Sequence, residues 1–405
     1  MKTHVIVKFH ELALKGKNRP MFVRALVDNL RKATRGTGVE RVWKGHMMAG
    51  LTLRDDSDWP AVKERVGDCF GVAKFFPARS VGRDLGEVKK LLAEELKQRS
   101  FGSFRITAHR ADKRFPITSH DINRDLGTFV QAETGARVDL THPEQQVFVD
   151  VLPEEVLVYF DEVRAFGGLP VGVSGKVTAL LSGGIDSPIA AWHMMKRGCK
   201  VDFVHFHSHP IVDTSSMEKA AELTQMLTRF QYESALQMVP FGEIQQHIIV
   251  STPPPYRVVL YRRFMVRIAE ALARKRGSLA LVTGDSLAQV SSQTLENITV
   301  VEEAATMPIF RPLIGFNKDE IINVARRIGT YPVSILPDQD CCTLFVPRHP
   351  VIRGRSDTVR KLEALLPVND LVEQALEAVE VKRFSFPEPS ATAPRPADAA
   401  AVLPG

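Results

Sequence analysis

The stretch Val177-Thr-Ala-Leu-Leu-Ser-Gly-Gly-Ile-Asp-Ser-Pro-Ile-Ala-Ala191 predicts a strand, a tight turn and the start of a helix. Its first part, Val177–Leu181, is a short apolar run typical of a buried strand. Residues 182–184 interrupt this run, and a helical pattern follows from Asp186, with Pro188 in the first turn, where its missing N–H costs nothing. Such a turn directs unpaired N–H groups and the positive end of the helix dipole at one point. The sequence therefore predicts an anion site here.

Two common phosphate-binding patterns do not fit this turn. A Walker loop requires a lysine after its last glycine, and no lysine follows Gly184, while the dinucleotide fingerprint Gly-x-Gly-x-x-Gly is absent. The six residues Ser182-Gly-Gly-Ile-Asp-Ser187 instead resemble the pyrophosphate loop of the ATP pyrophosphatase superfamily, which cleaves ATP to AMP and pyrophosphate. The alternative is an ordinary glycine-rich turn of an α/β sheet.

Composition places the chain in a broad class. A length of 405 residues allows two or three domains, and 44% hydrophobic and 25% charged residues are ordinary for a globular protein. The net charge of +6 permits a polyanionic partner without requiring one. No long apolar run begins the sequence or approaches a membrane span, so we expect no signal peptide and no membrane association. Four cysteines, two of them adjacent, do not form a disulfide framework, which indicates a reducing, cytoplasmic location.

The first 165 residues predict two small α+β domains. Residues 1–57 alternate strands with a helix whose apolar face repeats from Phe22 to Leu30, which suggests a ferredoxin-like domain. Residues 58–165 repeat this alternation, in an order that resembles a THUMP domain, an RNA-binding module of tRNA-modifying enzymes. Each domain carries a group of basic residues that could follow a phosphate backbone or form a solvated face. These groups are Lys15, Lys17, Arg19 and Arg24, and Arg105, His109, Arg110, Lys113 and Arg114.

Residues 166–383 predict a doubly wound parallel sheet, with its ligand site at the carboxyl ends of the strands. The sequence His205-Phe-His-Ser-His-Pro210 follows the second strand, and its alternating histidines share one face. No Cys or Glu completes a metal ligand set nearby, so a structural or nucleotide-contacting role is favoured. After the fourth strand, Gly284 and Gln293 could contact a base or ribose, and Arg262 on a long helix could contact phosphate or lie on the surface.

Cys341 and Cys342 lie in the loop-like stretch Pro337-Asp-Gln-Asp-Cys-Cys-Thr-Leu-Phe-Val-Pro347. Free cysteines are usually buried and inert, and two neighbours could simply fill a pocket. A cysteine pair beside a nucleotide domain is also a candidate nucleophile or redox pair. We expect the other two cysteines, Cys69 and Cys199, to be structural.

Taken together, these motifs resemble the tRNA 4-thiouridine sulfurtransferases (ThiI family) from about residue 4 to residue 383. The resemblance rests on the basic N-terminal part, the THUMP-like part and a series of motifs in the family's order. The motifs are Leu-Ser-Gly-Gly-Ile-Asp-Ser-Pro, His-Phe-His-Ser, Tyr-Arg-Arg-Phe-Met, Thr-Gly-Asp-Ser-Leu-Ala-Gln-Val and Asp-Cys-Cys-Thr.

The resemblance implies a mechanism. The family adenylates the C4 oxygen of the uridine at position eight of tRNA with ATP, and a cysteine persulfide then replaces AMP by sulfur. It implies that Asp186 assists catalysis, through Mg²⁺, and that Cys342, or else Cys341, carries the sulfur. The residues that match the family's ATP-contacting positions or the loop are Leu180, Leu181, Ser182, Gly183, Gly184, Ser187, His205, Phe206, Arg262, Gly284 and Gln293.

One departure concerns the source of sulfur. Some members carry a C-terminal rhodanese domain, whereas residues 384–405 are rich in proline and alanine, and we expect them to be disordered. Sulfur would then come from a separate donor, a cysteine desulfurase. Whether Cys341 and Cys342 cooperate, form a disulfide or bind an iron–sulfur cluster stays open, as does sulfur supply for the thiazole of thiamine. We also expect a homodimer.

Two alternatives remain at this point. One is another ATP pyrophosphatase that acts on tRNA or forms amides, which would need no cysteine. The other is an RNA-binding protein with an inactive nucleotide domain, which the intact Ser182–Ser187 motif disfavours.

Overall fold

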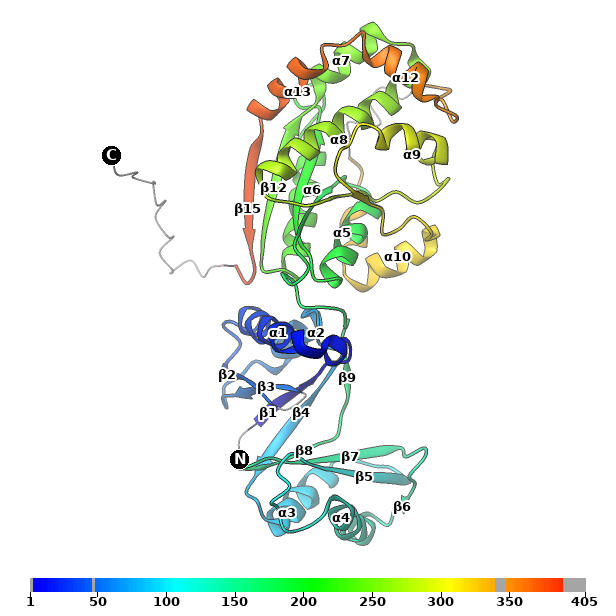
Figure 1. Ribbon diagram of the computed structural model, residues 1–405. Coiled ribbons are helices and arrows are strands. Elements are labelled where there is room, and N and C mark those ends of the chain that lie inside the picture. The colour runs from blue at the N-terminus through cyan, green and yellow to red at the C-terminus, as the bar shows by residue number, and fades with distance from the viewer. Residues whose placement is uncertain (1–2, 46–47, 339–346, 389–405) are drawn as a thin grey trace, which may run out of the picture. The chain divides into compact units, whose positions relative to one another are not determined.

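The structure is a computed structural model that describes residues 3–45, 48–338 and 347–388 (Figure 1). The chain divides into two compact units, Met1–Gly175 with His193–Lys200, and Lys176–Trp192 with Val201–Gly405. Within the described residues, no helix is long and apolar enough to cross a membrane.

The described residues of the first unit form a nine-stranded sheet in the order β2-β3-β1-β4-β8-β7-β5-β6, with β9 beside β4. The strands are β1 (Thr3–Lys8), β2 (Val39–Lys44), β3 (Ala49–Leu53), β4 (Lys74–Val81), β5 (Ser103–Arg110), β6 (Arg137–Val138), β7 (Gln145–Val151), β8 (Val156–Tyr159) and β9 (Val163–Arg164). The helices are η1 (Glu11–Asn18), α1 (Arg19–Ala33), α2 (Trp59–Asp68), α3 (Leu85–Leu96) and α4 (Ser119–Thr134). Strand β4 pairs antiparallel with both β1 and β8, so one sheet runs through both predicted α+β regions.

Three helices of the first unit begin where short polar side chains cap them. The side chains of Asp58, Asp84 and Thr118 accept hydrogen bonds from backbone N–H groups three residues later, at the starts of α2, α3 and α4. Helix α4 ends at Gly135, whose φ of 69° lies in the left-handed region that glycine adopts without strain. Local sequence therefore determines these boundaries. The predicted helix with an apolar face from Phe22 to Leu30 is confirmed as α1.

In the described part of the second unit, six strands form a sheet in the order β14-β13-β10-β11-β12-β15. The strands are β10 (Lys176–Leu180), β11 (Lys200–His207), β12 (Glu233–Pro240), β13 (Leu281–Val282), β14 (Ile309–Phe310) and β15 (Glu380–Ser385). The pairs β10–β13, β11–β12 and β13–β14 are parallel, which confirms the predicted doubly wound sheet. Strand β15 was not predicted. It pairs antiparallel with β12 and forms one edge of the sheet.

The helices of the second unit cover this sheet (Figure 1). They are α5 (Asp186–Lys196), α6 (Ser215–Thr228), α7 (Gly242–Ser251), η2 (Pro254–Tyr256), α8 (Arg257–Lys275), η3 (Ser291–Gln293), α9 (Leu295–Glu302), α10 (Lys318–Arg327), α11 (Tyr331–Ser334), α12 (Ser356–Glu363) and α13 (Val368–Glu377). Helix α8 is buried along most of its length and contributes more residues to the largest apolar core than its neighbours do. This helix contacts α9, α12 and α13 and also contacts the sheet.

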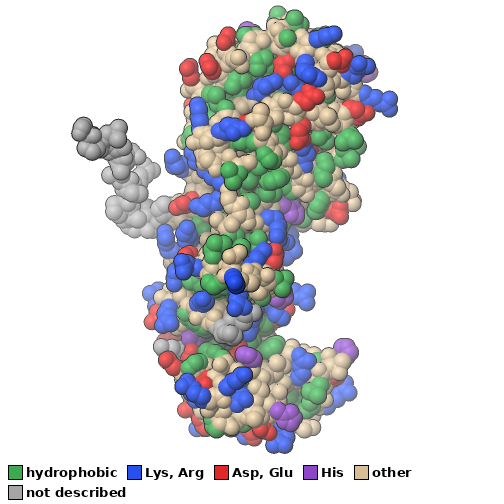
Figure 2. All heavy atoms as spheres, viewed as in Figure 1, with side chains coloured by type: hydrophobic (Ala, Val, Ile, Leu, Met, Phe, Trp, Pro, Cys, Tyr) green, Lys and Arg blue, Asp and Glu red, His purple; other side chains and the backbone are tan. Residues whose placement is uncertain are grey.

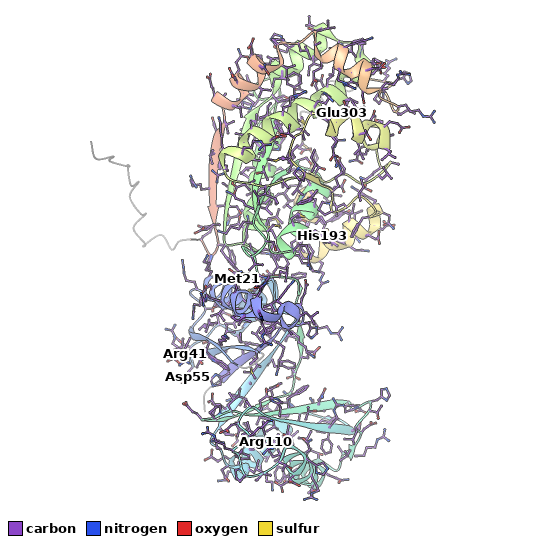
Figure 3. The ribbon with its side chains drawn as sticks, viewed as in Figure 1. Met21, Arg41, Asp55, Arg110, His193 and Glu303 are labelled. Carbon is purple, nitrogen blue, oxygen red and sulfur yellow. The ribbon has the colours of Figure 1, made fainter. Side chains whose placement is uncertain are left out.

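A buried ion pair holds α12 against α8. Arg263, only 2% exposed, donates from Nε and Nη2 to the Glu363 carboxylate over 3.1 and 2.7 Å, and Arg267 Nη2 donates to the same carboxylate over 2.9 Å. Glu303, labelled in Figure 3, lies 3.8 Å from Arg263 Nη1. Burial disfavours the charged form of Glu363, but hydrogen bonds and charge from Arg263 and Arg267 outweigh it and lower the pKa of this carboxyl.

We predict that Glu363→Ala lowers the free energy of unfolding by about 3–5 kcal/mol, because it leaves the Arg263 guanidinium buried without its carboxylate. Urea denaturation measures this change. The matched control is Glu377→Ala, at an exposed position at the end of α13, which should change the stability by less than about 0.5 kcal/mol. Equal effects of the two substitutions would contradict the assignment.

The same pair predicts a pH dependence. Because the folded-state pKa of Glu363 lies below its ordinary value of 4.5, its stabilisation is present above pH 4.5 and is lost as the pH falls through the folded-state pKa. The stability difference between the wild type and Glu363→Gln should therefore shrink as the pH falls below 4.5. A difference that is constant from pH 7 downward would contradict this prediction.

Candidate active site

The predicted anion loop follows β10 and is closed by two hydroxyl groups. Ser182 N–H donates to Ser187 Oγ over 2.9 Å, and the two serine Oγ atoms lie 3.1 Å apart. Gly184 N–H donates to Ser182 Oγ over 3.3 Å. Ser187 lies in the first turn of α5, so the hydroxyls tie the loop to the positive end of that helix dipole.

The end of β13 passes directly beside the start of α5. A Cβ atom on Gly284 would lie 2.7 Å from the backbone nitrogen of Ser187 and 2.9 Å from the carbonyl carbon of Asp186. Cβ atoms essentially never come this close to another heavy atom, and the backbone atoms that they would meet here cannot give way as a flexible side chain can. Glycine is therefore required at this position, because the parallel pairing of β10 and β13 brings the two backbones together.

A cavity of about 260 Å³ opens at this edge of the sheet. It is lined by ten of the residues that the sequence predicted as site residues, namely Leu180, Leu181, Ser182, Asp186, Ser187, His205, Phe206, Arg262, Gly284 and Gln293. The predicted residues Gly183 and Gly184 do not line it. Cys341 and Cys342, the predicted sulfur carriers, lie outside the described residues. The cavity lining combines apolar and polar side chains, as ligand sites commonly do.

Asp186 is held by two side chains that the sequence analysis did not select. Lys318 Nζ donates to Asp186 Oδ1 over 2.6 Å, and Gln289 Nε2 donates to Asp186 Oδ2 over 2.9 Å. Lys318 follows Asn317, whose side chain accepts a hydrogen bond from Glu320 N–H in the capping box that starts α10. Because 132 positions separate Lys318 from Asp186, no local pattern could reveal the contact.

Arg262 lines the cavity and pairs with the buried carboxylate of Asp285. Its Nη2 donates to Asp285 Oδ1, and its Nη1 donates to the carbonyl oxygen of Ser292 over 2.9 Å. Gln293 Nε2 donates to the same Asp285 oxygen over 3.3 Å. Burial disfavours the charge on Asp285, but Arg262, Thr283 and Arg311 outweigh this effect and lower the pKa of Asp285. The Asp285 carboxylate thus orients both polar side chains expected at a nucleotide.

His205 and His207, at the end of β11, have separate environments. His205 lines the cavity, with Nδ1 2.9 Å from the carbonyl oxygen of Leu181. Burial, with added positive charge from His205, His209 and Lys382, lowers the pKa of His207 to about 4, so this ring is neutral at pH 7. In the described part of the chain, no group of three or more His, Cys, Asp or Glu side chains is placed to hold a metal ion.

Several predicted RNA-contacting residues instead brace the first unit. Arg110, labelled in Figure 3, donates from Nη1 to the carbonyl oxygens of Phe115 and Ile117 over 3.0 and 3.1 Å. Arg105 Nη1 donates to the carbonyl oxygen of Leu140 over 2.8 Å, so Arg105 and Arg110 are the bracing arginines. Arg114 pairs with Asp112 but leaves 86% of its side chain exposed.

Other basic residues of this unit lie at the surface. Lys17, Arg24, His109 and Lys113 are exposed, and the face drawn in Figure 2 shows Lys and Arg side chains spread over the unit. These exposed residues are better placed to meet a polyanion than the bracing arginines are.

The cysteines of the described residues are not exposed nucleophiles. Cys69 and Cys199, which were expected to be structural, are both buried. Burial raises the pKa of the Cys199 thiol, which disfavours the reactive thiolate.

The chain matches three protein-family descriptions along its length. Residues 4–75 match the "ThiI ferredoxin-like domain", residues 83–161 the "THUMP domain", and residues 172–368 the "Thiamine biosynthesis protein (ThiI)" family. Together the three matches fall in both compact units and end at residue 368.

Similar proteins and structures extend over nearly the whole chain. A "Probable tRNA sulfurtransferase" of Thermus thermophilus is 52% identical over 390 residues, which are 96% of this chain and 95% of that protein. One of Brevibacillus brevis is 39% identical and covers 94% of this chain and 96% of its own length. A crystal structure of a 4-thiouridine synthetase–RNA complex with bound ATP superposes with a TM-score of 0.87 at 35% identity, covering 95% of this chain and 100% of that one.

We predict that Gly284→Ala weakens ATP binding at least about tenfold, because the added Cβ displaces the first turn of α5 and with it the anion loop. Calorimetric titration with Mg-ATP measures this change. The matched control is Gly315→Ala, where no atom lies within 4 Å of the added Cβ and binding should be unchanged. Wild-type ATP affinity in Gly284→Ala would show that the close approach is not required.

Proposed function

The chain belongs to the tRNA sulfurtransferase family, and on this premise we propose that it converts the uridine at position eight of tRNA to 4-thiouridine with ATP. The observation that carries the proposal is the cavity at the end of β10, which gathers ten expected site residues around the pyrophosphate-loop motif. The proposal retains the predicted domains, at residues 1–57, 58–165 and 166–383. The predicted tail, 384–405, began too early, because Phe384 and Ser385 belong to β15 and pair with β12.

The first step is adenylation of the base. The uridine C4 oxygen attacks the α-phosphorus of ATP, a P–O bond breaks, and pyrophosphate leaves with the bonding electrons. The N–H groups of the loop and the N-terminus of α5 stabilise the negative charge on the leaving group. The ammonium group of Lys318, fixed 2.6 Å from Asp186, adds a positive charge at the same end of the cavity.

Magnesium is the metal that fits this site. Mg²⁺ is usually bound by one or two carboxylates together with substrate phosphates, and Asp186 supplies one carboxylate at the cavity with 20% of its side chain exposed. When bound, the ion would neutralise phosphate charge. Asp186 and Lys318 would position that end of the nucleotide.

The second step transfers sulfur. The terminal sulfur of a persulfide on Cys342 attacks C4 of the adenylated base, and AMP leaves. A second thiolate, for which Cys341 is the candidate, then attacks the cysteine sulfur of the adduct, so that 4-thiouridine departs and a disulfide remains. An external thiol reductant must reduce that disulfide before the next cycle.

We extend the proposal to the partners. A cysteine desulfurase supplies the persulfide, the exposed basic residues of the first unit bind tRNA, and the chain acts in the cytoplasm as a homodimer. The family description "Thiamine biosynthesis protein (ThiI)" also supports sulfur supply for the thiazole of thiamine.

The test is 4-thiouridine formation in unmodified tRNA, with purified protein, Mg-ATP, a cysteine desulfurase and cysteine. We expect the wild type to form 4-thiouridine. In Asp186→Ala the rate should fall at least about 100-fold, because that substitution frees Lys318 from its fixed position. We expect Cys342→Ala to be inactive with the desulfurase. Liquid chromatography of the digested tRNA measures the product.

The matched controls are Asp370→Ala, at an exposed position on α13, and Cys199→Ala, which removes a buried thiol. Both should retain wild-type rates. If Cys342→Ala forms thiouridine with free sulfide but not with the desulfurase, Cys342 carries the sulfur and adenylation does not depend on it. A wild type that consumes ATP but forms no thiouridine would refute the substrate assignment.

A further inference from the structure

A buried lysine lies beside the anion loop and takes no part in the steps described so far. Lys219, on α6, has only 6% of its side chain exposed. Its Nζ donates to the carbonyl oxygen of Leu336 over 2.6 Å and lies 3.4 Å from Asp338 Oδ2. Lysine is rarely buried to this degree unless its charge is paired, so the position indicates a specific task.

The lysine and its aspartate cover the first glycine of the loop. A Cβ on Gly183 would lie 2.1 Å from Asp338 Oδ2 and 3.1 Å from Lys219 Cδ. Gly183 is accordingly buried, whereas Gly184 is exposed. An ammonium group and a carboxylate thus lie at the point where the loop motif is expected to hold phosphate.

The Asp338 carboxylate is poorly satisfied at this position. Its Oδ2 atom is buried and, within the described residues, accepts no hydrogen bond, although the Lys219 ammonium faces it. A phosphate group at the loop would bring further negative charge against this oxygen, and like charges repel strongly where water is excluded. The ammonium group can serve either anion, because lysine carries three rotatable N–H donors.

We propose that Lys219 binds the pyrophosphate part of ATP at the Ser182–Gly184 loop, and that Asp338 is its counter-ion when no nucleotide is bound. Lys219 then has the role that a Walker loop gives to the lysine after its last glycine, which this loop lacks. As the P–O bond to the α-phosphorus breaks, the ammonium stabilises the charge that develops on the departing pyrophosphate. This inference rests on the proposed ATP-dependent function and adds a catalytic residue to it.

The test compares three ligands, Mg-ATP, pyrophosphate and AMP, by calorimetric titration of the full-length protein. Lys219→Met preserves the length of the side chain and removes its charge. We expect it to weaken ATP and pyrophosphate binding about 10- to 100-fold, as for loss of a charge-assisted hydrogen bond, and AMP binding less than about threefold. The matched control is Lys275→Met, at an exposed position at the end of α8, which should leave all three affinities unchanged.

Asp338→Asn supplies an independent measurement, which decides the proposal even if Lys219→Met fails to fold. Removing the competing charge should tighten pyrophosphate binding about 3- to 10-fold. In the Lys219→Met background the same substitution should give no gain, because the shared ammonium is gone. Unchanged or weaker pyrophosphate binding by Asp338→Asn would overturn the proposal that Lys219 leaves Asp338 to bind pyrophosphate.

A purely structural role of Lys219 would give a different result. If Lys219 only supports the fold, Lys219→Met should weaken AMP binding as much as ATP binding and lower the unfolding temperature, and this result would overturn the proposal. The two proposals fail separately. Thiouridine formation with wild-type pyrophosphate affinity in Lys219→Met refutes the role of Lys219 alone, whereas a Lys219-dependent pyrophosphate site without thiouridine formation refutes the substrate alone.

Discussion

The site depends on the close approach of two backbones, the end of β13 at Gly284 and the first turn of α5 at Asp186 and Ser187. Parallel pairing of β10 with β13 sets this distance, and glycine at position 284 permits it. The approach brings the residues that follow β13 alongside the anion loop. As a result, Asp285 and Gln289 lie within hydrogen-bond reach of Arg262 and Asp186, respectively.

Three positively charged side chains at the site are each paired with a carboxylate. Lys318 contacts Asp186, Arg262 contacts Asp285, and Lys219 contacts Asp338. Charged groups taken from water are costly unless they are paired, which is why the buried Lys219 and the largely buried Arg262 have carboxylate partners. The paired groups also start close to their working geometry, so less conformational entropy is lost when a polyanionic ligand arrives.

The first unit shows why counting charges overestimates a binding surface. Arg105 and Arg110 are basic residues of β5, yet both donate to backbone carbonyl oxygens of neighbouring loops. Guanidinium groups with several donors are well suited to this bracing role. The exposed residues Lys17, Arg24 and Lys113 have no such role among the described hydrogen bonds, and they are the better candidates for contacting tRNA.

The amino-acid sequence by itself determined the order of strands and helices, the capped helix starts and the loop motif at residues 182–187, because all of these follow from local patterns. It also indicated most of the cavity lining, since the carboxyl ends of parallel strands meet at one edge of a sheet. Only the tertiary structure decided that β15 closes the sheet antiparallel to β12, that Lys318 reaches Asp186, and that Lys219 and Asp338 cover Gly183. Those contacts join residues far apart in the chain, so the packing of whole elements decides them and no pattern of neighbouring residues records them.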